Sequence, residues 1–344
     1  MVDRKIRVLV VDESAFARKV IRETLSADPR IDVVGIARDG LDALEQIETL
    51  KPDVITLDLV MPDLDGVGVL KALRNQGNPP AVVVVSIADE SSELGVAALA
   101  EGAFDVVHKP TALAIEQLYD LGADLVAKVV AAARSTHRPS VRGLEIARPH
   151  TPSRPTRTEM LVIGASTGGP QALTQLIRAL PRDFAVPVVI VLHMPPGYTE
   201  AFARRLDKES DIDVIEAQDG LALRAGQVVI ARAGIHLTVQ RSGTGWRCNL
   251  DIKPLGTLHR PSVDVLFVSA AREVGSGTLG VLLTGMGNDG LEGSHEIHKV
   301  GGRLLTEAES SCVVYGMPRC VFQAGLATAQ GPIDSMAALI ALHL

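Results

Sequence analysis

The sequence has few aromatic residues and cysteines, no long hydrophobic run and no excess of basic residues. Aromatics make up only 3% of the 344 residues, so the cores must be built mainly from Val, Leu, Ile and Ala. No apolar run approaches the roughly 20 residues of a membrane-spanning helix, which argues against membrane insertion. The formal net charge of −7 gives no electrostatic reason to expect nucleic-acid binding.

The cysteines and the N-terminal residues together predict a cytoplasmic protein. Cys248, Cys312 and Cys320 are odd in number and match no zinc or redox spacing, so we expect three buried thiols in a reducing compartment. The first residues, Met-Val-Asp-Arg-Lys-Ile-Arg, lead straight into an apolar strand pattern and do not resemble a signal peptide.

The length and one segment of unusual composition predict two domains. Residues 134–158 show no hydrophobic periodicity and contain six arginines, four prolines and a single acidic residue, Glu145. Such a segment cannot bury a core, so we interpret it as a tether. Its arginines could instead bind an acidic partner, but a soluble linker is the simpler interpretation. The predicted organisation is a domain at 1–133, a linker at 134–158 and a second domain at 159–344.

The first domain alternates short apolar runs with amphipathic segments. Five β-α units of this kind predict a parallel sheet with helices on both faces. The predicted strands are residues 6–11, 31–37, 54–57, 81–85 and 104–107, and the predicted helices are residues 15–25, 41–50, 67–74, 93–100 and 114–133.

Polar residues stand at the carboxyl ends of four of these predicted strands, where chemistry is found in parallel sheets. They are Asp12 and Glu13, Asp58, Ser86 and Lys109. Converging carboxylates suit Mg²⁺, while a hydroxyl and a lysine can contact a phosphoryl group. Any one of them alone is more often a solvated loop residue, but together they predict a phosphorylation site.

These residues lie in motifs that resemble the receiver domains of bacterial response regulators, over residues 5 to 130. The motifs are Val-Asp-Glu-Ser near the start, Leu-Asp58-Leu-Val-Met-Pro-Asp-Leu-Asp-Gly, and His-Lys109-Pro110. The resemblance implies that a sensor histidine kinase phosphorylates Asp58. It also implies that Asp12, Glu13 and Asp58 hold Mg²⁺, and that Ser86 and Lys109 contact the phosphoryl group.

Two residues depart from the receiver pattern. Glu13 stands where an aspartate is commoner, so the side chain of one metal ligand is longer but has the same charge. Val106 stands where many receivers carry a switching Tyr or Phe. The usual aromatic rotamer switch is therefore in doubt.

The second domain opens on a strand, a Gly-rich turn and a helix. An apolar run at 160–163 is followed by Gly-Ala-Ser166-Thr-Gly and then by an amphipathic segment at 171–180. A G-x-S-x-G turn in this context makes its serine a candidate nucleophile. The same turn could instead bind the phosphates of a dinucleotide, or Ser166 could merely cap the helix.

A short-chain dehydrogenase, which has a similar turn, also needs a tyrosine four residues before a lysine. The three tyrosines, Tyr119, Tyr198 and Tyr315, are followed at that distance by Ala123, Phe202 and Arg319, so none fits.

A histidine and an aspartate follow two further predicted strands of this domain. His193 comes after the apolar run at 186–192, and Asp289 lies in the Gly-rich segment after the run at 279–283. If the strands are parallel, Ser166, His193 and Asp289 share one edge of one sheet, as acyl transfer requires. Four other histidines remain open as rival bases from their residues alone: His236, His259, His295 and His298.

Three short runs, at 227–231, 236–240 and 246–251, are punctuated by glycines. We interpret all three as antiparallel strands inserted in an otherwise parallel, doubly wound α/β domain.

This half of the chain resembles the chemotaxis protein-glutamate methylesterases, whose catalytic domain follows a receiver. The matching stretches are Ile163-Gly-Ala-Ser-Thr-Gly-Gly169, Leu192-His-Met-Pro-Pro-Gly-Tyr-Thr199, His259-Arg-Pro-Ser-Val-Asp-Val265, Leu283-Thr-Gly-Met-Gly-Asn-Asp-Gly290 and Cys312-Val-Val-Tyr-Gly-Met-Pro-Arg319.

The resemblance implies a triad of Ser166, His193 and Asp289. We expect an oxyanion site at the backbone amide of Thr167, and the resemblance adds that of Met286. The implied substrates are glutamyl methyl esters, and glutamine amides, on the cytoplasmic helices of methyl-accepting chemoreceptors. No cofactor is expected for this domain. The alternative is a binding module that has lost catalysis and only docks a receptor.

Overall fold

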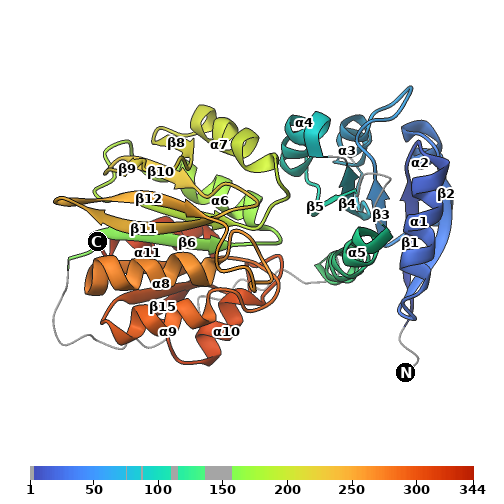
Figure 1. The fold of residues 1–344 in the computed structure, drawn as a ribbon. Helices are drawn as coiled ribbons and strands as arrows, with labels where there is room; N and C mark the ends of the chain where they lie inside the picture. Colours follow the sequence, from blue (N-terminus) through green and yellow to red (C-terminus); the bar gives the residue numbers. More distant parts are fainter. Residues whose placement is uncertain (1–3, 75, 87, 110–114, 136–156) are drawn as a thin grey trace. The chain divides into compact units, whose positions relative to one another are not determined.

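The computed structural model describes residues 4–74, 76–86, 88–109, 115–135 and 157–344. The chain separates into two compact units, residues 1–139 and 140–344, and each contains its own parallel sheet (Figure 1). The predicted linker at 134–158 falls mostly outside the described residues, so its character stays a prediction. In the part of the chain that is described, no helix is long and apolar enough to cross a membrane.

The first unit is a five-stranded parallel sheet with the strand order β2-β1-β3-β4-β5. Helices α1 and α5 pack together on one face, and α2, α3 and α4 follow one another on the other. This confirms the predicted (βα)5 fold. The elements are β1 Ile6–Val11, α1 Ala15–Ser26, β2 Ile31–Ala37, α2 Gly40–Leu50, β3 Val54–Leu57, α3 Gly66–Arg74, β4 Ala81–Ser86, α4 Ala88–Ala100, β5 Asp105–His108 and α5 Ile115–Ser135.

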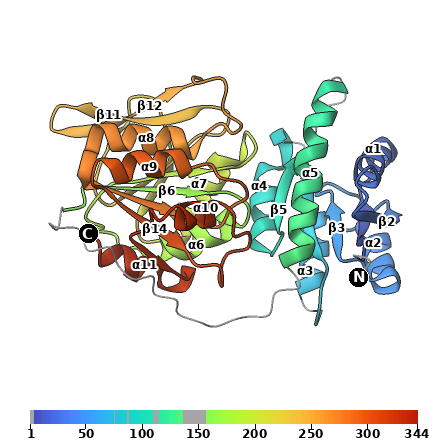
Figure 2. The ribbon, with the colours of Figure 1, turned by 90° about the horizontal axis from the view of Figure 1, so that it is seen from below.

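The second unit is built on a seven-stranded parallel sheet with the order β15-β14-β13-β6-β7-β10-β8. Helices α6 and α11 lie on one face and α8 and α9 on the other (Figure 2). The strands are β6 Met160–Ala165, β7 Val188–Leu192, β8 Asp213–Glu216, β9 Ala222–Leu223, β10 Gln227–Ile230, β11 His236–Ser242, β12 Gly245–Asp251, β13 Thr278–Leu282, β14 Arg303–Glu307 and β15 Ala329–Gly331. The helices are α6 Gly169–Arg178, α7 Tyr198–Glu209, α8 Val263–Val274, α9 Leu291–Lys299, α10 Met317–Gln323 and α11 Ile333–Ala341.

The prediction of an antiparallel strand at 227–231 is wrong. Strand β10 pairs parallel to β7 on one side and to β8 on the other, inside the main sheet. All four of its residues are buried, and a run buried on both faces is typical of a parallel strand rather than of a half-exposed hairpin. The other two strands are antiparallel as expected: β11 pairs with β12, which also pairs with the short β9.

The cysteines only partly match the prediction of three buried thiols. Cys248 and Cys312 are buried, but Cys320 is partly exposed, and none of the three forms a disulfide. Burial raises the pKa of the Cys248 thiol to about 12, so this side chain behaves as an inert apolar group.

Candidate active site

Sheet register places Ser166 beside His193. Strands β6 and β7 are neighbours in the sheet, and Ala165 at the end of one pairs with Leu192 at the end of the other. The amide of His193 donates to the carbonyl of Ala165 at 3.1 Å. Because each functional residue is the next one along its strand, the pairing of the two strands brings the hydroxyl and the imidazole to the same edge.

Glycines allow the tight turn that presents Ser166. Gly168 has a φ of +78°, and a Cβ there would stand 2.4 Å from the Cβ of Val313. A Cβ on Gly285, in the loop after β13, would stand 2.9 Å from the Cβ of Ser166. The backbone of that loop therefore passes directly against the serine, which no larger residue would permit.

His193 and Asp289 form a short hydrogen bond. The Nε2 atom of His193 lies 2.8 Å from Oδ2 of Asp289, and the two side chains are only 9% and 10% exposed. The second ring nitrogen, Nδ1, is buried and has no hydrogen-bond partner among the described residues. If Nε2–H donates to the carboxylate, Nδ1 carries the free lone pair that a general base needs.

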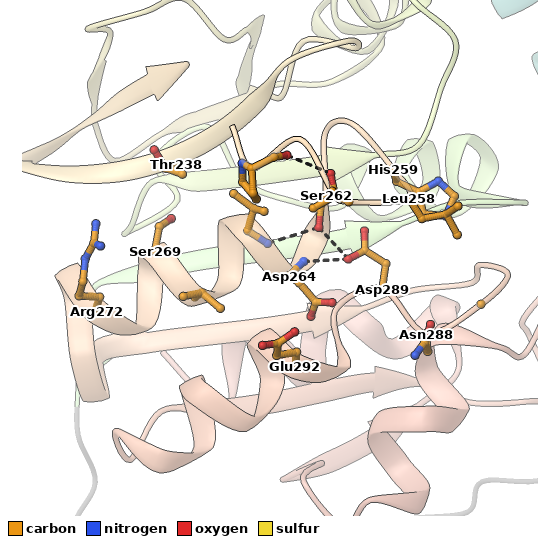
Figure 3. Close-up of a pocket in the computed structure, with 16 residues that line it drawn as sticks. Thr238, Leu258, His259, Ser262, Asp264, Ser269, Arg272, Asn288, Asp289 and Glu292 are labelled. Carbon is orange, nitrogen blue, oxygen red and sulfur yellow. Dashed lines mark hydrogen bonds between the residues drawn. The ribbon is translucent and has the colours of Figure 1, made fainter. Parts of the chain in front are cut away.

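Asp289 is held at the N-terminus of α8. Its Oδ1 accepts from the hydroxyl of Ser262 at 2.9 Å and from the amide of Asp264 at 3.0 Å, and its Oδ2 accepts from the amide of Val263 at 2.7 Å. Figure 3 shows the bonds from Ser262 and Asp264. Burial raises the pKa of Asp289, but His193 and these donors outweigh it and hold the pKa below its usual range.

Ser262 is a site residue that the sequence analysis missed. It is the N-cap of α8, and its hydroxyl accepts from the amide of Val265 as well as donating to Asp289. A serine just before an apolar helical run is a recognisable cap signal, and it could have identified this helix start. That its hydroxyl also reaches Asp289 depends on tertiary packing.

The two predicted oxyanion donors flank the serine. Thr167 follows it in the turn, and Met286 follows Gly285 in the neighbouring loop. The amide of Ser166 donates to the carbonyl of Thr284 at 3.0 Å, which joins the turn to this loop. Within the described part of the chain, the amides of Thr167 and Met286 donate to no other group. Both are therefore available to an oxygen that develops negative charge.

The four rival histidines have different surroundings. His295 and His298 are exposed on α9. His236 is buried, its Nδ1 accepts from the amide of Ser262 at 3.2 Å, and burial lowers its pKa. His259 stacks face to face on the ring of His193, with centroids 4.1 Å apart. Sequence spacing could not have predicted this stacking.

A cavity of about 580 Å³ opens beside Asp289, lined by residues of α8 and of the loop before it (Figure 3). Its wall includes His259, Asp264 and Glu292. The Asp264 carboxylate accepts from the amide of Gly293 at 2.7 Å. Burial, and then the neighbouring Asp289, raise the pKa of Asp264 to about 6, although the bond from Gly293 opposes them.

In the first unit, Lys109 joins two of the predicted carboxylates. Its Nζ lies 2.6 Å from Oδ2 of Asp12 and 2.6 Å from Oδ2 of Asp58. Ser86 is buried at the same edge, and its carbonyl accepts from the amide of Lys109. Burial, and to a lesser degree Asp58, raise the pKa of Asp12, although Lys109 opposes them.

These carboxylates are suited to a hard divalent cation, since two oxygens already converge on one positive charge. Glu13 is exposed, and among the described residues no group of three His, Cys, Asp or Glu side chains gathers as a metal site. Val106 is buried in β5, and its carbonyl accepts from Nζ of Lys128 at 2.8 Å.

Comparison with known proteins matches both halves of the chain. Residues 161–340 match the sequence model of the CheB methylesterase family, and residues 8–120 match that of the response regulator receiver domain. The protein-glutamate methylesterase/protein-glutamine glutaminase 5 of Myxococcus xanthus is 56% identical over 98% of each chain. The protein-glutamate methylesterase/protein-glutamine glutaminase of Symbiobacterium thermophilum is 44% identical over 98% of this chain and 96% of its own.

Among solved structures, the catalytic domain of the CheB methylesterase of Thermotoga maritima is 37% identical, with a TM-score of 0.53. It matches over 55% of this chain and 100% of its own. With these matches on both units, the chain belongs to the CheB methylesterase family and carries a response regulator receiver domain before its catalytic domain.

Proposed function

We propose that this protein hydrolyses glutamyl methyl esters on methyl-accepting chemoreceptors for chemotactic adaptation, with Ser166, His193 and Asp289 as its triad. The relatives named as protein-glutamate methylesterases support the reaction. The observation that carries the residue assignment is the bond between His193 Nε2 and Asp289, which leaves Nδ1 without a hydrogen bond to any described residue, at the end of the strand next to that of Ser166.

In the first half of the reaction, Ser166 attacks the ester carbonyl while Nδ1 of His193 takes the hydroxyl proton. The resulting imidazolium donates through Nε2 to Asp289, whose carboxylate stays ionised because four donors surround it. The oxyanion of the tetrahedral intermediate accepts from the amides of Thr167 and Met286. One such donor contributes about 2.7–4 kcal/mol to catalysis.

Collapse of the intermediate breaks the ester bond, and methanol leaves with the proton that His193 held. Water then attacks the acyl-enzyme by the same route, with His193 taking its proton, and releases the glutamate side chain and Ser166. A glutamine side chain would pass through the same steps and release ammonia. Its amide is a poorer leaving group, so we expect that deamidation is slower.

We further propose that phosphorylation of Asp58 by a sensor histidine kinase activates the esterase. Asp12, Glu13 and Asp58 would hold Mg²⁺, which supplies positive charge to the phosphoryl oxygens when bound. Lys109 already pairs with Asp58, and we assign Lys109 and Ser86 to contacts with the phosphoryl group. The linker keeps the two domains at a high effective concentration, so a weak inhibitory contact can control access to the site.

Methanol release from methylated receptor fragments, with and without a phosphodonor, tests the proposal. Ser166→Ala removes only one hydroxyl from a turn, so the fold should persist while turnover falls by several orders of magnitude. Retention of more than about a tenth of wild-type turnover would refute the triad. A chain that binds receptor but releases no methanol would favour the docking alternative.

A further inference from the structure

Thr284 connects the two chain segments that carry the proposed oxyanion donors. It lies two residues past the end of β13 and two residues before Met286. Its carbonyl accepts from the amide of Ser166 at 3.0 Å. Its hydroxyl lies 2.9 Å from the carbonyl of Thr167 and 3.4 Å from that of Val314, and it donates over the shorter distance to Thr167. One residue thus bonds to the nucleophile turn through both its backbone and its side chain.

The same residue is anchored on its other side by buried groups. Its hydroxyl accepts from the amide of Val314 at 2.9 Å, and its own amide donates to Oε2 of Glu307 at 2.7 Å. Glu307 is fully buried at the end of β14, and its Oε1 accepts from the hydroxyl of Ser311 at 2.8 Å. Burial raises the pKa of Glu307, and these donors oppose that effect.

We propose that Thr284 is a positioning residue that sets the separation of the Thr167 and Met286 amides, with Glu307 as its buried anchor. The inference rests on the proposed function, because it needs Ser166 as nucleophile. An oxyanion site works only if its donors are fixed in place before charge develops. These two donors stand on separate segments, and the hydroxyl of Thr284 ties one segment to the other.

Loss of this hydroxyl should affect the transition state more than the bound ester. The ground-state carbonyl carries little charge and depends weakly on the donors, whereas the oxyanion depends on both. A displacement of about 1 Å far from the reacting atoms can lower a rate about 100-fold. We therefore expect kcat to fall while KM hardly changes.

The test compares substitutions at Thr284 in the full chain by methanol release and thermal unfolding. Thr284→Val keeps the branched shape without the hydroxyl and should lower kcat about 10- to 100-fold, with KM within about twofold. Thr284→Ser restores the hydroxyl and should return kcat to within about threefold of wild type. Thr284→Cys has a weak thiol donor, so its kcat should lie between those of the valine and serine variants. It replaces Thr284→Val if that variant does not fold.

Thr278→Val is the matched control. Thr278 is the first residue of β13, at the opposite end of that strand from Thr284. It is buried, and its hydroxyl donates to the carbonyl of Ala270 at 3.2 Å. The Thr278→Val substitution should lower the unfolding temperature but leave kcat unchanged. The proposal is overturned if Thr284→Val keeps wild-type kcat, if Thr284→Ser is as slow as Thr284→Val, or if Thr278→Val loses kcat equally.

Ser166→Ala, measured in parallel, separates the two proposals. An active Ser166→Ala variant refutes the triad and this inference with it. An inactive Ser166→Ala variant beside a fully active Thr284→Val variant refutes the positioning role alone.

Discussion

His193 bonds to Asp289 through Nε2, so Nδ1, the nitrogen closer to the main chain, is left without a hydrogen bond in the described part of the chain and is the one that our proposal assigns to Ser166. This follows from the sheet. Ser166 and His193 each come directly after strands that pair up to Ala165 and Leu192, and neighbouring strands lie about 4.8 Å apart. The register places the two residues on neighbouring strands, and Nε2 of His193 reaches Asp289 in the loop that follows β13.

A first prediction concerns the choice of base among the histidines. His193→Gln should abolish turnover, because the amide cannot accept the serine proton and return it to methanol. The controls are His295→Gln and His298→Gln on the exposed surface of α9, which should keep nearly full activity. An essential role for either one, with His193 dispensable, would mean that the triad is assigned wrongly.

The second prediction concerns Ser262. Ser262→Ala removes one of four donors to Asp289 and the cap of α8, so kcat should fall about 3- to 30-fold and stability by about 1 kcal/mol. Asp289→Asn should be far more damaging, because its amide group offers no charge to the imidazolium. Steady-state kinetics and urea unfolding of both variants provide the measurement. Equal kcat losses would show that Ser262 does more than hold the carboxylate.

Asp264 supplies a prediction about pH. Its pKa is raised from 3.8 to about 6, so the folded state holds this proton more tightly than the unfolded state does. The resulting stability is complete below the unfolded value and is lost as pH rises through about 6.

Asp264→Asn does not ionise, so it should lack this loss. From about pH 4 to about pH 6, the free energy of unfolding of the variant should therefore increase relative to that of wild type. We expect an increase of about 1 kcal/mol after allowance for solvent screening. Urea unfolding across that range measures the gain. A difference between the two proteins that does not vary with pH would contradict the raised pKa.

Inhibition by the receiver gives a fourth prediction. A fragment of residues 150–344 should turn over methylated receptor fragments faster than the unphosphorylated full chain, since the tether that holds the receiver near the site is gone. Both proteins are compared without phosphodonor. Equal rates would show that the receiver does not control this site by covering it.

The switch inside the receiver gives a fifth prediction. Asp58→Asn should leave the chain at its unphosphorylated rate whatever phosphodonor is added. Because Val106 replaces the usual aromatic, Ser86 should carry the response, and Ser86→Ala should take up phosphate without activation. Phosphate incorporation and methanol release are followed together. Full activation of phosphorylated Ser86→Ala would assign the switch to other groups.

Strongly patterned elements could be predicted from the sequence, and contacts between distant segments could not. The strand at 160–165 and the following turn were predictable because an apolar run and a Gly-rich turn are local signals. The prediction for the run at 227–231 is wrong because its length and the glycines around it suit a hairpin as well, and only the burial of β10 between β7 and β8 decides the question.

The candidate site divides in the same way. Ser166, His193 and Asp289 could be selected as candidates because each comes after a strand of one parallel sheet. The stacking of His259 on His193 and the bond from Ser262 to Asp289 could not, because both join segments that meet only in the folded chain. The anchoring of Thr284 by Glu307, 23 positions along the sequence, belongs to the same class.

The pairing of Ala165 with Leu192 has a consequence for how activity can be adjusted. Amides in the centre of a buried parallel sheet open to solvent only when the whole unit unfolds, whereas loop amides open locally at far lower free energy. Ser166 and His193 each directly follow a residue of β6 or β7, the two paired strands at the centre of the sheet. A regulatory signal of a few kcal/mol is smaller than the free energy of unfolding the unit, so it is too weak to separate Ser166 from His193. The segment from Met286 to Gly290 lies in a loop outside the sheet, so hydrogen exchange should show a response to phosphorylation there and not in β6 or β7.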